Sequence, residues 1–164
     1  MFGRNFRNLR KAVLAIFSLV ALASPSLAAD KSFSKLPGRW VGNGWIQMTS
    51  GDRETIRCTA TYFLKKNGNS LNQNLRCASA SYTVVGKGLL DSKGGKISGS
   101  WNEQNFDLSG QVSGVASGNT IKLNVNGPNF KAKFSVKTTG TKQSVVISSQ
   151  GNNIAKLVIN LRKG

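Results

Sequence analysis

The chain has 164 residues, carries a formal net charge of +17 and contains no histidine. The missing histidine excludes Ser-His-Asp triads, Cys-His pairs and nearly all catalytic zinc sites. We therefore expect a binding protein that is not an enzyme and that needs no cofactor or metal.

Residues 1–28 have the three parts of a secretory signal peptide. The first eleven residues include four basic and no acidic side chains, the next twelve are almost wholly apolar, and Ser26 and Ala28 are small residues at the spacing that signal peptidase reads. A retained membrane anchor is the weaker alternative, because a spanning helix needs about 20 apolar residues. We expect a mature chain that starts near Ala29 or Asp30, is periplasmic or secreted and has no transmembrane segment.

Residues 29–37 are expected to form an N-terminal arm, and residues 38–164 a single folded domain. Removal of the signal leaves 19 basic and six acidic residues, a net charge of +13. The basic residues are spread evenly along the sequence. This distribution is typical of a soluble surface that attracts anions in general, and it does not indicate a specific nucleic-acid reader.

The domain is predicted to contain only β-strands. Short runs rich in Val, Ile, Thr, Phe and Tyr alternate with Gly, Asn, Ser and Asp, and no helical period exceeds one turn. The connections are only a few residues long, so consecutive strands should pair antiparallel. The expected fold is a single antiparallel up-and-down β-barrel of about eight to ten strands. The predicted runs are Trp40–Met48, Thr55–Lys66, Ser70–Ala78, Ser81–Leu89, Lys96–Asn102, Asn105–Val115, Thr120–Asn126, Asn129–Thr138, Gln143–Ser149 and Asn153–Arg162.

One hairpin can be predicted to its register. Asn67-Gly68 is a preferred pair for a two-residue type I′ turn. Centring the hairpin there sets Cys58 opposite Cys77 at a hydrogen-bonded site, where Cα atoms lie about 5.5 Å apart. Two cysteines in an oxidising compartment also predict a disulfide. The other expected pairs are Lys66–Asn69, Leu64–Leu71, Tyr62–Gln73 and Ala60–Leu75.

Gly38 and Trp40 resemble the Gly-x-Trp that opens the first strand of the calycin barrels, the lipocalins and avidins. In lipocalins the Trp closes one end of the barrel and an Arg after the last strand packs across it. Arg162 lies in a corresponding place, so the resemblance implies a barrel-closing set of Gly38, Trp40 and Arg162 with a cation–π contact. The lipocalin middle motif and final helix are absent. Small bacterial metalloprotease inhibitors share the same opening, a disulfide and a barrel.

Two surface features are candidates for contacts. Trp45 lies on the opposite face of its strand from Trp40, so it is either exposed to a partner or covered by the arm, and the second interpretation is the simpler. Strand alternation also puts three lysines on one face of a single strand, away from its apolar face. These candidate anion-binding residues are Lys131, Lys133 and Lys137.

The resemblance and the composition together favour an exported binding protein of the cell envelope, monomeric and holding a small apolar ligand in the barrel. Two alternatives remain. The basic faces could bind an anionic polymer of the envelope, or residues 30–37 could insert into the cleft of a protease. A glycosidase-like pair of carboxylates is the weakest interpretation, because the neighbouring acids, Asp52 with Glu54 and Glu103 with Asp107, read as turn residues.

Overall fold

The computed structural model describes residues 30–65 and 68–164. The predicted signal peptide and the Lys66–Asn69 pair therefore lie, wholly or in part, outside the described residues. Each predicted run corresponds to one strand, with ends that differ by a few residues. The strands are β1 (Gly38–Met48), β2 (Arg53–Leu64), β3 (Ser70–Ala78), β4 (Thr83–Lys93), β5 (Lys96–Glu103), β6 (Leu108–Ser117), β7 (Thr120–Asn126), β8 (Lys131–Thr139), β9 (Lys142–Gln150) and β10 (Ile154–Lys163).

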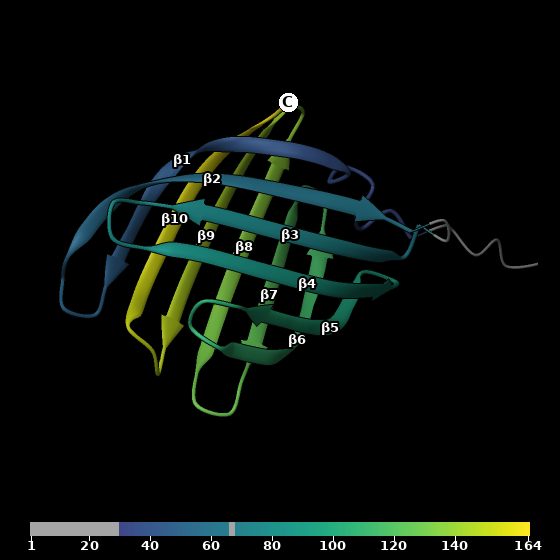
Figure 1. The fold of residues 1–164 in the computed structure, drawn as a ribbon. Coiled ribbons are helices and arrows are strands. Elements are labelled where there is room, and N and C mark those ends of the chain that lie inside the picture. The colour runs from purple at the N-terminus through teal and green to yellow at the C-terminus, as the bar shows by residue number, and fades with distance from the viewer. Residues whose placement is uncertain (1–29, 66–67) are drawn as a thin grey trace, which may run out of the picture.

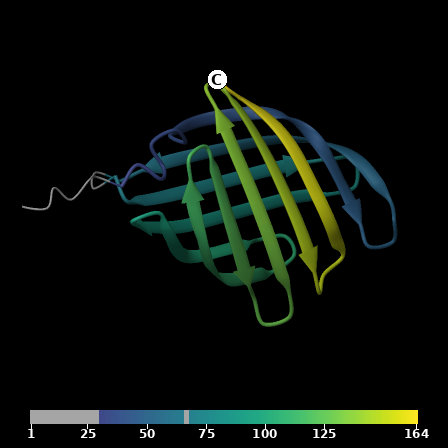
Figure 2. The same ribbon diagram turned by 180° about the vertical axis from the view of Figure 1, so that it is seen from behind.

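The ten strands form a closed antiparallel barrel in which each strand pairs with its sequence neighbours and β1 pairs with β10. The predicted up-and-down barrel is confirmed. In Figure 1, strands β2–β5 lie in front and cross strands β7–β10 behind them at a steep angle. Figure 2 shows the same barrel from the side of β7–β10. Within the described ranges, no helix has the length and hydropathy to cross a membrane.

The seam between β1 and β10 depends on two glycines. A Cβ atom at Gly42 would lie 1.9 Å from the carbonyl oxygen of Asn160, and one at Gly44 would lie 1.8 Å from that of Val158. Both distances are far inside van der Waals contact, so any side chain there would push the two backbones apart. Glycine is therefore what lets the first and last strands approach closely enough to pair and close the barrel.

The β2–β3 hairpin confirms the predicted pairing. Leu64 pairs with Leu71, and Cys58 pairs with Cys77 in a disulfide. The predicted hydrogen-bonded site is wrong, however, because the Cα atoms of the two cysteines are 4.0 Å apart. The reason is the turn: the N–H of Lys65 donates to the carbonyl of Ser70 at 2.9 Å. Hydrogen-bonded sites alternate from that pair, which leaves the cysteines at a non-hydrogen-bonded site, where Cα atoms lie closer together.

Candidate binding sites

The barrel interior is filled by side chains. Two apolar cavities lie on either side of Leu75, Phe134 and Ile147, and each offers about 40 Å³ to a water-sized sphere. A site for a drug-sized ligand has about 300–1,000 Å³. Each of these two cavities as it stands therefore admits only molecules the size of water, and a larger ligand there would have to displace core side chains.

The indole N–H of Trp101 is a buried hydrogen-bond donor without a protein partner among the described residues. Its ring packs against Phe130 and Phe134, with centroids 6.2 and 5.8 Å away. Gly86 and Gly88 on the neighbouring strand leave room for the indole, since a Cβ atom at Gly86 would lie 3.2 Å from Trp101 Nε1. The Nε1 hydrogen has no acceptor among the described residues, although the atom is buried. An acceptor supplied by a ligand or a water would remove the cost of that unpaired donor.

The N-terminal arm closes one end of the barrel. Phe33 and Leu36 are almost completely buried there, and the carbonyl of Leu36 accepts a hydrogen bond of 2.7 Å from Trp40 Nε1. Gly38 has a φ of +112°, a value that L side chains rarely adopt, where the arm turns into β1. Gly38 and Trp40 therefore lie at a barrel end, as the resemblance implies, and Trp40 is 0% exposed.

The cation over the Trp40 ring is Lys163, not Arg162. Lys163 Nζ lies 5.5 Å from the ring centroid, which is within range of a cation–π contact. The register of β1 and β10 explains the correction, because it pairs Trp40 with Lys163 and Val41 with Arg162. Successive residues of a strand point to opposite faces, so Arg162 projects from the outer surface of the barrel.

Hydrogen bonds tie the start of the arm to the β4–β5 hairpin. The carboxylate of Asp30 accepts bonds from Ser32 N (2.9 Å), Ser92 Oγ (2.8 Å) and Gly95 N (3.3 Å). Lys35 Nζ donates to Asn119 at the β6–β7 turn. The bonds from Ser32, followed by those from Ser92 and Gly95, hold the pKa of Asp30 far below its usual value.

We expect the docked arm to loosen in acid. The pKa of Asp30 is depressed in the folded state, so its contribution to stability is complete above about pH 4 and is lost as the pH falls further. The effect should stay below about 1 kcal/mol, because the charge is close to solvent. In an NMR titration the amides of Ser32 and Gly95 should shift with a midpoint well below the usual Asp range. An ordinary midpoint, or an unchanged titration in Asp30→Asn, would contradict the contact.

The other acidic side chains near turns also support the backbone. Glu103 is buried, and its carboxylate accepts bonds from Val85 N (2.5 Å) and Phe106 N (2.6 Å). Glu54 accepts a bond from Ser81 N at 3.1 Å, and hydrogen bonds from Ser81 and Ser79 lower its pKa. In the described part of the chain no three potential metal ligands gather. These carboxylates thus act as turn residues, in line with the simpler interpretation of the sequence.

The outer surface divides into two halves of different charge. All six acidic residues of the arm and the domain precede Leu108, whereas residues 108–164 contain eight Lys and Arg and no Asp or Glu. The latter stretch forms strands β6–β10, which follow one another around the barrel, and β7–β10 make up the side that faces the viewer in Figure 2. We call the exposed cations on the outer face of these strands the basic wall; they are Lys122, Lys131, Lys133, Lys137, Lys142, Lys156 and Arg162.

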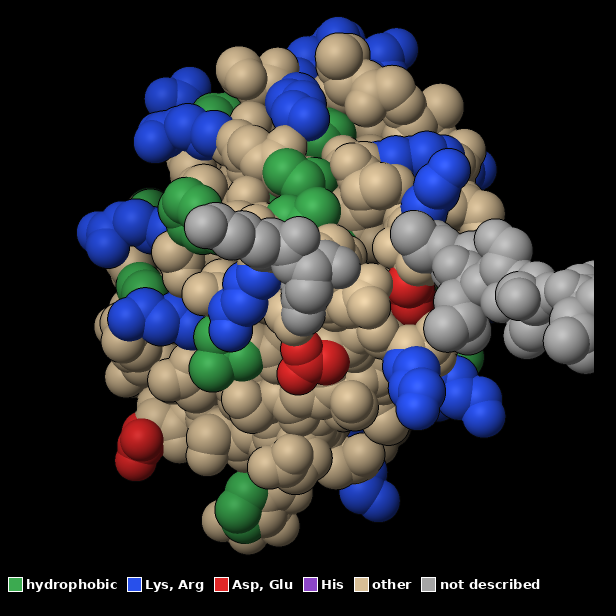
Figure 3. Space-filling model, turned by 90° about the vertical axis from the view of Figure 1, so that its right-hand side faces the viewer, with side chains coloured by type: hydrophobic (Ala, Val, Ile, Leu, Met, Phe, Trp, Pro, Cys, Tyr) green, Lys and Arg blue, Asp and Glu red, His purple; other side chains and the backbone are tan. Residues whose placement is uncertain are grey.

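Of the basic wall, the sequence analysis identifies only Lys131, Lys133 and Lys137 as candidate anion-binding residues. The basic residues are evenly spread along the sequence. The pattern that indicates the wall is the absence of acidic residues after Asp107. By comparison, the face on the side of the arm carries both basic and acidic side chains. There, Lys and Arg side chains lie around the rim and a few acidic side chains lie between them (Figure 3).

The three candidate lysines all belong to the basic wall, but Lys133 and Lys137 line different grooves. Lys131, Lys133 and Lys137 are all exposed, as predicted. Lys137 lines a groove of about 380 Å³ together with Lys142 and Arg162. Lys133 lines a second groove, of about 630 Å³, together with Lys122. Arg162, expected at the end of the barrel, is thus a neighbour of Lys137 on the wall.

Trp45 lies at the edge of the basic wall and is not covered by the arm, so the simpler interpretation of its environment is wrong. The guanidinium carbon of Arg53 lies 3.6 Å from the Trp45 ring centroid, and Lys156 Nζ lies 5.7 Å from it. The arm covers Trp40 instead, because the strand places the two indoles on opposite faces. Trp45 therefore holds two cations in position beside the wall.

No protein-family model and no curated protein matches the chain. Several solved structures share its fold, among them the following three. Rv2717c from M. tuberculosis superposes with a TM-score of 0.62 at 12% identity, over 84% of this chain and 99% of its own. A protein of unknown function from the DUF3598 family of Nostoc punctiforme gives 0.55 at 12% identity, over 80% of this chain and 49% of its own. The S-type phycobiliprotein lyase CPES from Guillardia theta gives 0.53 at 11% identity, over 80% and 90%.

Identities of 11–12% show the fold and nothing further. The neighbours and the strand order agree with the resemblance carried by Gly38 and Trp40, and binding is compatible with a barrel of this kind. The chain has a closed ten-strand antiparallel barrel fold, which these solved structures share.

Proposed function

We propose that this protein is an exported, non-enzymatic barrel that binds an anionic polymer of the cell envelope through its basic wall. The observation that carries the proposal is the pairing of Arg162 with Lys142. These two exposed cations lie directly opposite each other on adjacent strands, and they line one groove with Lys137. Like charges in directly opposed positions destabilise a sheet.

The rest of the wall supplies no compensating charge, because strands β6–β10 contain no acidic residue. A similar pair, Lys93 with Lys96, occurs in the β4–β5 hairpin, but there Asp91 lies two residues from Lys93 on the same face. An anion bound in the groove would neutralise Lys142 and Arg162. A polymer would extend the same contact to the second groove, around Lys122 and Lys133.

The test is the salt dependence of binding to purified lipopolysaccharide. Each cation that contacts an anionic polymer releases counterions, and for nucleic acids each contact adds about 0.7–0.9 to the slope of log K against log salt. We expect steep salt dependence for the wild type. The triple variant Lys137→Gln, Lys142→Gln, Arg162→Gln should flatten the slope by about two units on that scale.

A matched variant controls for net charge. Lys65, Lys93 and Lys96 are exposed and lie outside the basic wall. Replacing these three with Gln removes the same charge and should leave the slope nearly unchanged. Equal slopes for the two triple variants would show a nonspecific charge effect, and equal slopes for all three proteins would leave the wall with a role in solubility alone.

A second candidate function is specifically favoured by Trp101. Its unpaired Nε1 hydrogen lies in an apolar interior, the environment expected of a site for a small apolar ligand with one hydrogen-bond acceptor. Such a ligand would need core side chains to move. Native mass spectrometry of the purified protein would detect it, and Trp101→Phe, which keeps an aromatic ring and removes the donor, should reduce its occupancy. An unliganded mass in every preparation would contradict this function.

The protease-inhibitor alternative needs residues 30–37 to be free and extended. Phe33 and Leu36 are instead buried in the end of the barrel, and Asp30 is bonded to Ser92. Releasing the arm would expose both apolar side chains to water, at a cost of about 1.5–3 kcal/mol each. We therefore do not propose inhibition.

A further inference from the structure

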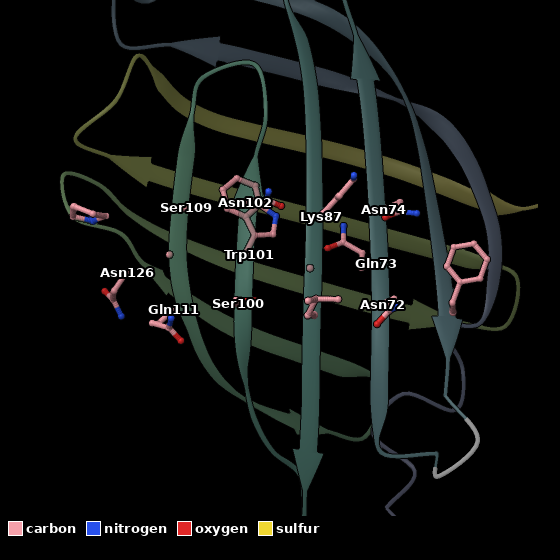
Figure 4. A pocket seen from close by; sticks show the side chains of 15 residues that line it. Asn72, Gln73, Asn74, Lys87, Ser100, Trp101, Asn102, Ser109, Gln111 and Asn126 are labelled. Atoms are coloured by element: carbon pink, nitrogen blue, oxygen red, sulfur yellow. The ribbon is translucent and has the colours of Figure 1, made fainter.

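A groove of about 1020 Å³, larger than either groove of the basic wall, lies on the outer face of β2–β7, and its Asn126 pairs with Lys131 at the edge of the wall. Two rows of cross-strand neighbours line it. The first row crosses six strands and the second crosses four, and Figure 4 shows labelled members of both. The first row consists of Phe63, Asn72, Leu89, Ser100, Gln111 and Asn126. The second row consists of Asn74, Lys87, Asn102 and Ser109.

The polar side chains of this groove, which we call the amide groove, are available to a ligand. Six of them are primary amides: Asn72, Gln73, Asn74, Asn102, Gln111 and Asn126. Across residues 30–65 and 68–164, none of these amides hydrogen-bonds to another protein group. By contrast, the amides of Asn105, Gln143 and Asn152 donate to protein acceptors. Each free amide offers two donors and an acceptor.

Two large apolar side chains lie in the same row as the amides. Phe63 is 54% exposed and Leu89 is 56% exposed, the highest values among the large hydrophobic residues of the described ranges. They are separated in the row by Asn72 alone. Apolar surface alternating with amides fits a ligand that has both apolar faces and many hydroxyl groups.

The charge of the groove restricts the ligand class. Lys87 is its one charged side chain, and no acid lines it. An anionic polymer would favour the basic wall, where the cations are more numerous. An extended peptide has no strand edge to join, because the barrel is closed.

We propose that the amide groove binds a neutral, linear polysaccharide that runs across the strands. Neighbouring strands lie about 4.8 Å apart, which is close to the length of one hexose unit in an extended chain. Each side chain of the six-strand row, from Phe63 to Asn126, would then meet one sugar unit. Amides would bond the hydroxyl groups, and the Phe63 ring would cover the apolar face of a pyranose.

The test is a titration of the full mature protein with neutral hexasaccharides built from glucose or N-acetylglucosamine, followed by NMR or calorimetry. We expect binding to be independent of salt. The variant Asn74→Ala, Asn102→Ala, Gln111→Ala should weaken it at least about tenfold, because several polar contacts are lost together. All three residues are exposed, so thermal unfolding should stay close to that of the wild type.

The matched control removes three exposed amides outside the groove, with Asn43→Ala, Asn124→Ala and Asn160→Ala. This variant should bind as the wild type does, and so should the Lys137, Lys142 and Arg162 variant of the basic wall. No affinity for any hexasaccharide, an equal loss in the groove and control variants, or a steep salt dependence would each overturn the proposal. The lipopolysaccharide slope measured on the basic wall is a separate result, so the two proposals can fail independently.

Discussion

Replacing Trp40 with Ala should lower the free energy of unfolding by about 3–5 kcal/mol, the usual cost of removing a large aromatic side chain from a core. Trp40 is 0% exposed, and it holds the arm by donating to the carbonyl of Leu36 at 2.7 Å. The substitution would leave a cavity under the arm and an unpaired buried carbonyl. It would also remove the ring beneath Lys163. Urea denaturation followed by circular dichroism measures the loss.

Trp45→Ala is the matched control for this prediction. Trp45 lies on the same strand, but it faces outward between Arg53 and Lys156. We expect a loss below about 2 kcal/mol, because each of the two cation–π contacts contributes about 0.5–1 kcal/mol at an exposed site. The role of Trp40 in closing the barrel would be disproved by equal losses in the two variants.

Replacing both Cys58 and Cys77 with Ala should lower the free energy of unfolding by about 2–5 kcal/mol, the usual cost of removing a native disulfide from a small secreted domain. The bond joins residues 19 positions apart, so it restricts the unfolded chain, and both side chains are buried among core residues. Denaturation of the wild type with and without a reductant provides an independent measure of the same loss.

A thiol titration checks the bond itself. The described residues contain no free cysteine. In the unfolded, non-reduced protein, no thiol should therefore react with the titration reagent. Two reactive thiols per chain would contradict the disulfide, and a stability loss confined to the Ala variant would point to packing as its origin.

Most of the fold could be predicted from local sequence patterns. The alternation of apolar and polar residues shows which side chains of a strand face inward, so the ten strands and the exposed lysines of β8 could be predicted without any long-range information. The pairing of Cys58 with Cys77 was equally accessible, because it depends on counting outward from one turn. The prediction that this pair is a hydrogen-bonded site was wrong, because the bond from Lys65 N to the carbonyl of Ser70 makes Lys65–Ser70 a hydrogen-bonded pair, and the sites alternate from there.

The register between the first and last strands could not be predicted from local patterns. Arg162 and Lys163 are adjacent cations, and the sequence shows only that they point to opposite faces. The β1–β10 register decides which of them meets Trp40. That register depends on the closure of the whole barrel, including the close backbone approach at Gly42 and Gly44.

The sequence by itself determined the class of fold, the order of strands, the cysteine pair and the excess of positive charge, because these depend on composition and on contacts between neighbouring strands. The tertiary structure alone decided where the binding surfaces lie. Lys137 and Arg162 share a groove, and Phe63 and Asn126 belong to one row, although each pair is far apart in sequence. Side chains on different strands become neighbours only when the curvature, register and closure of the sheet are set together.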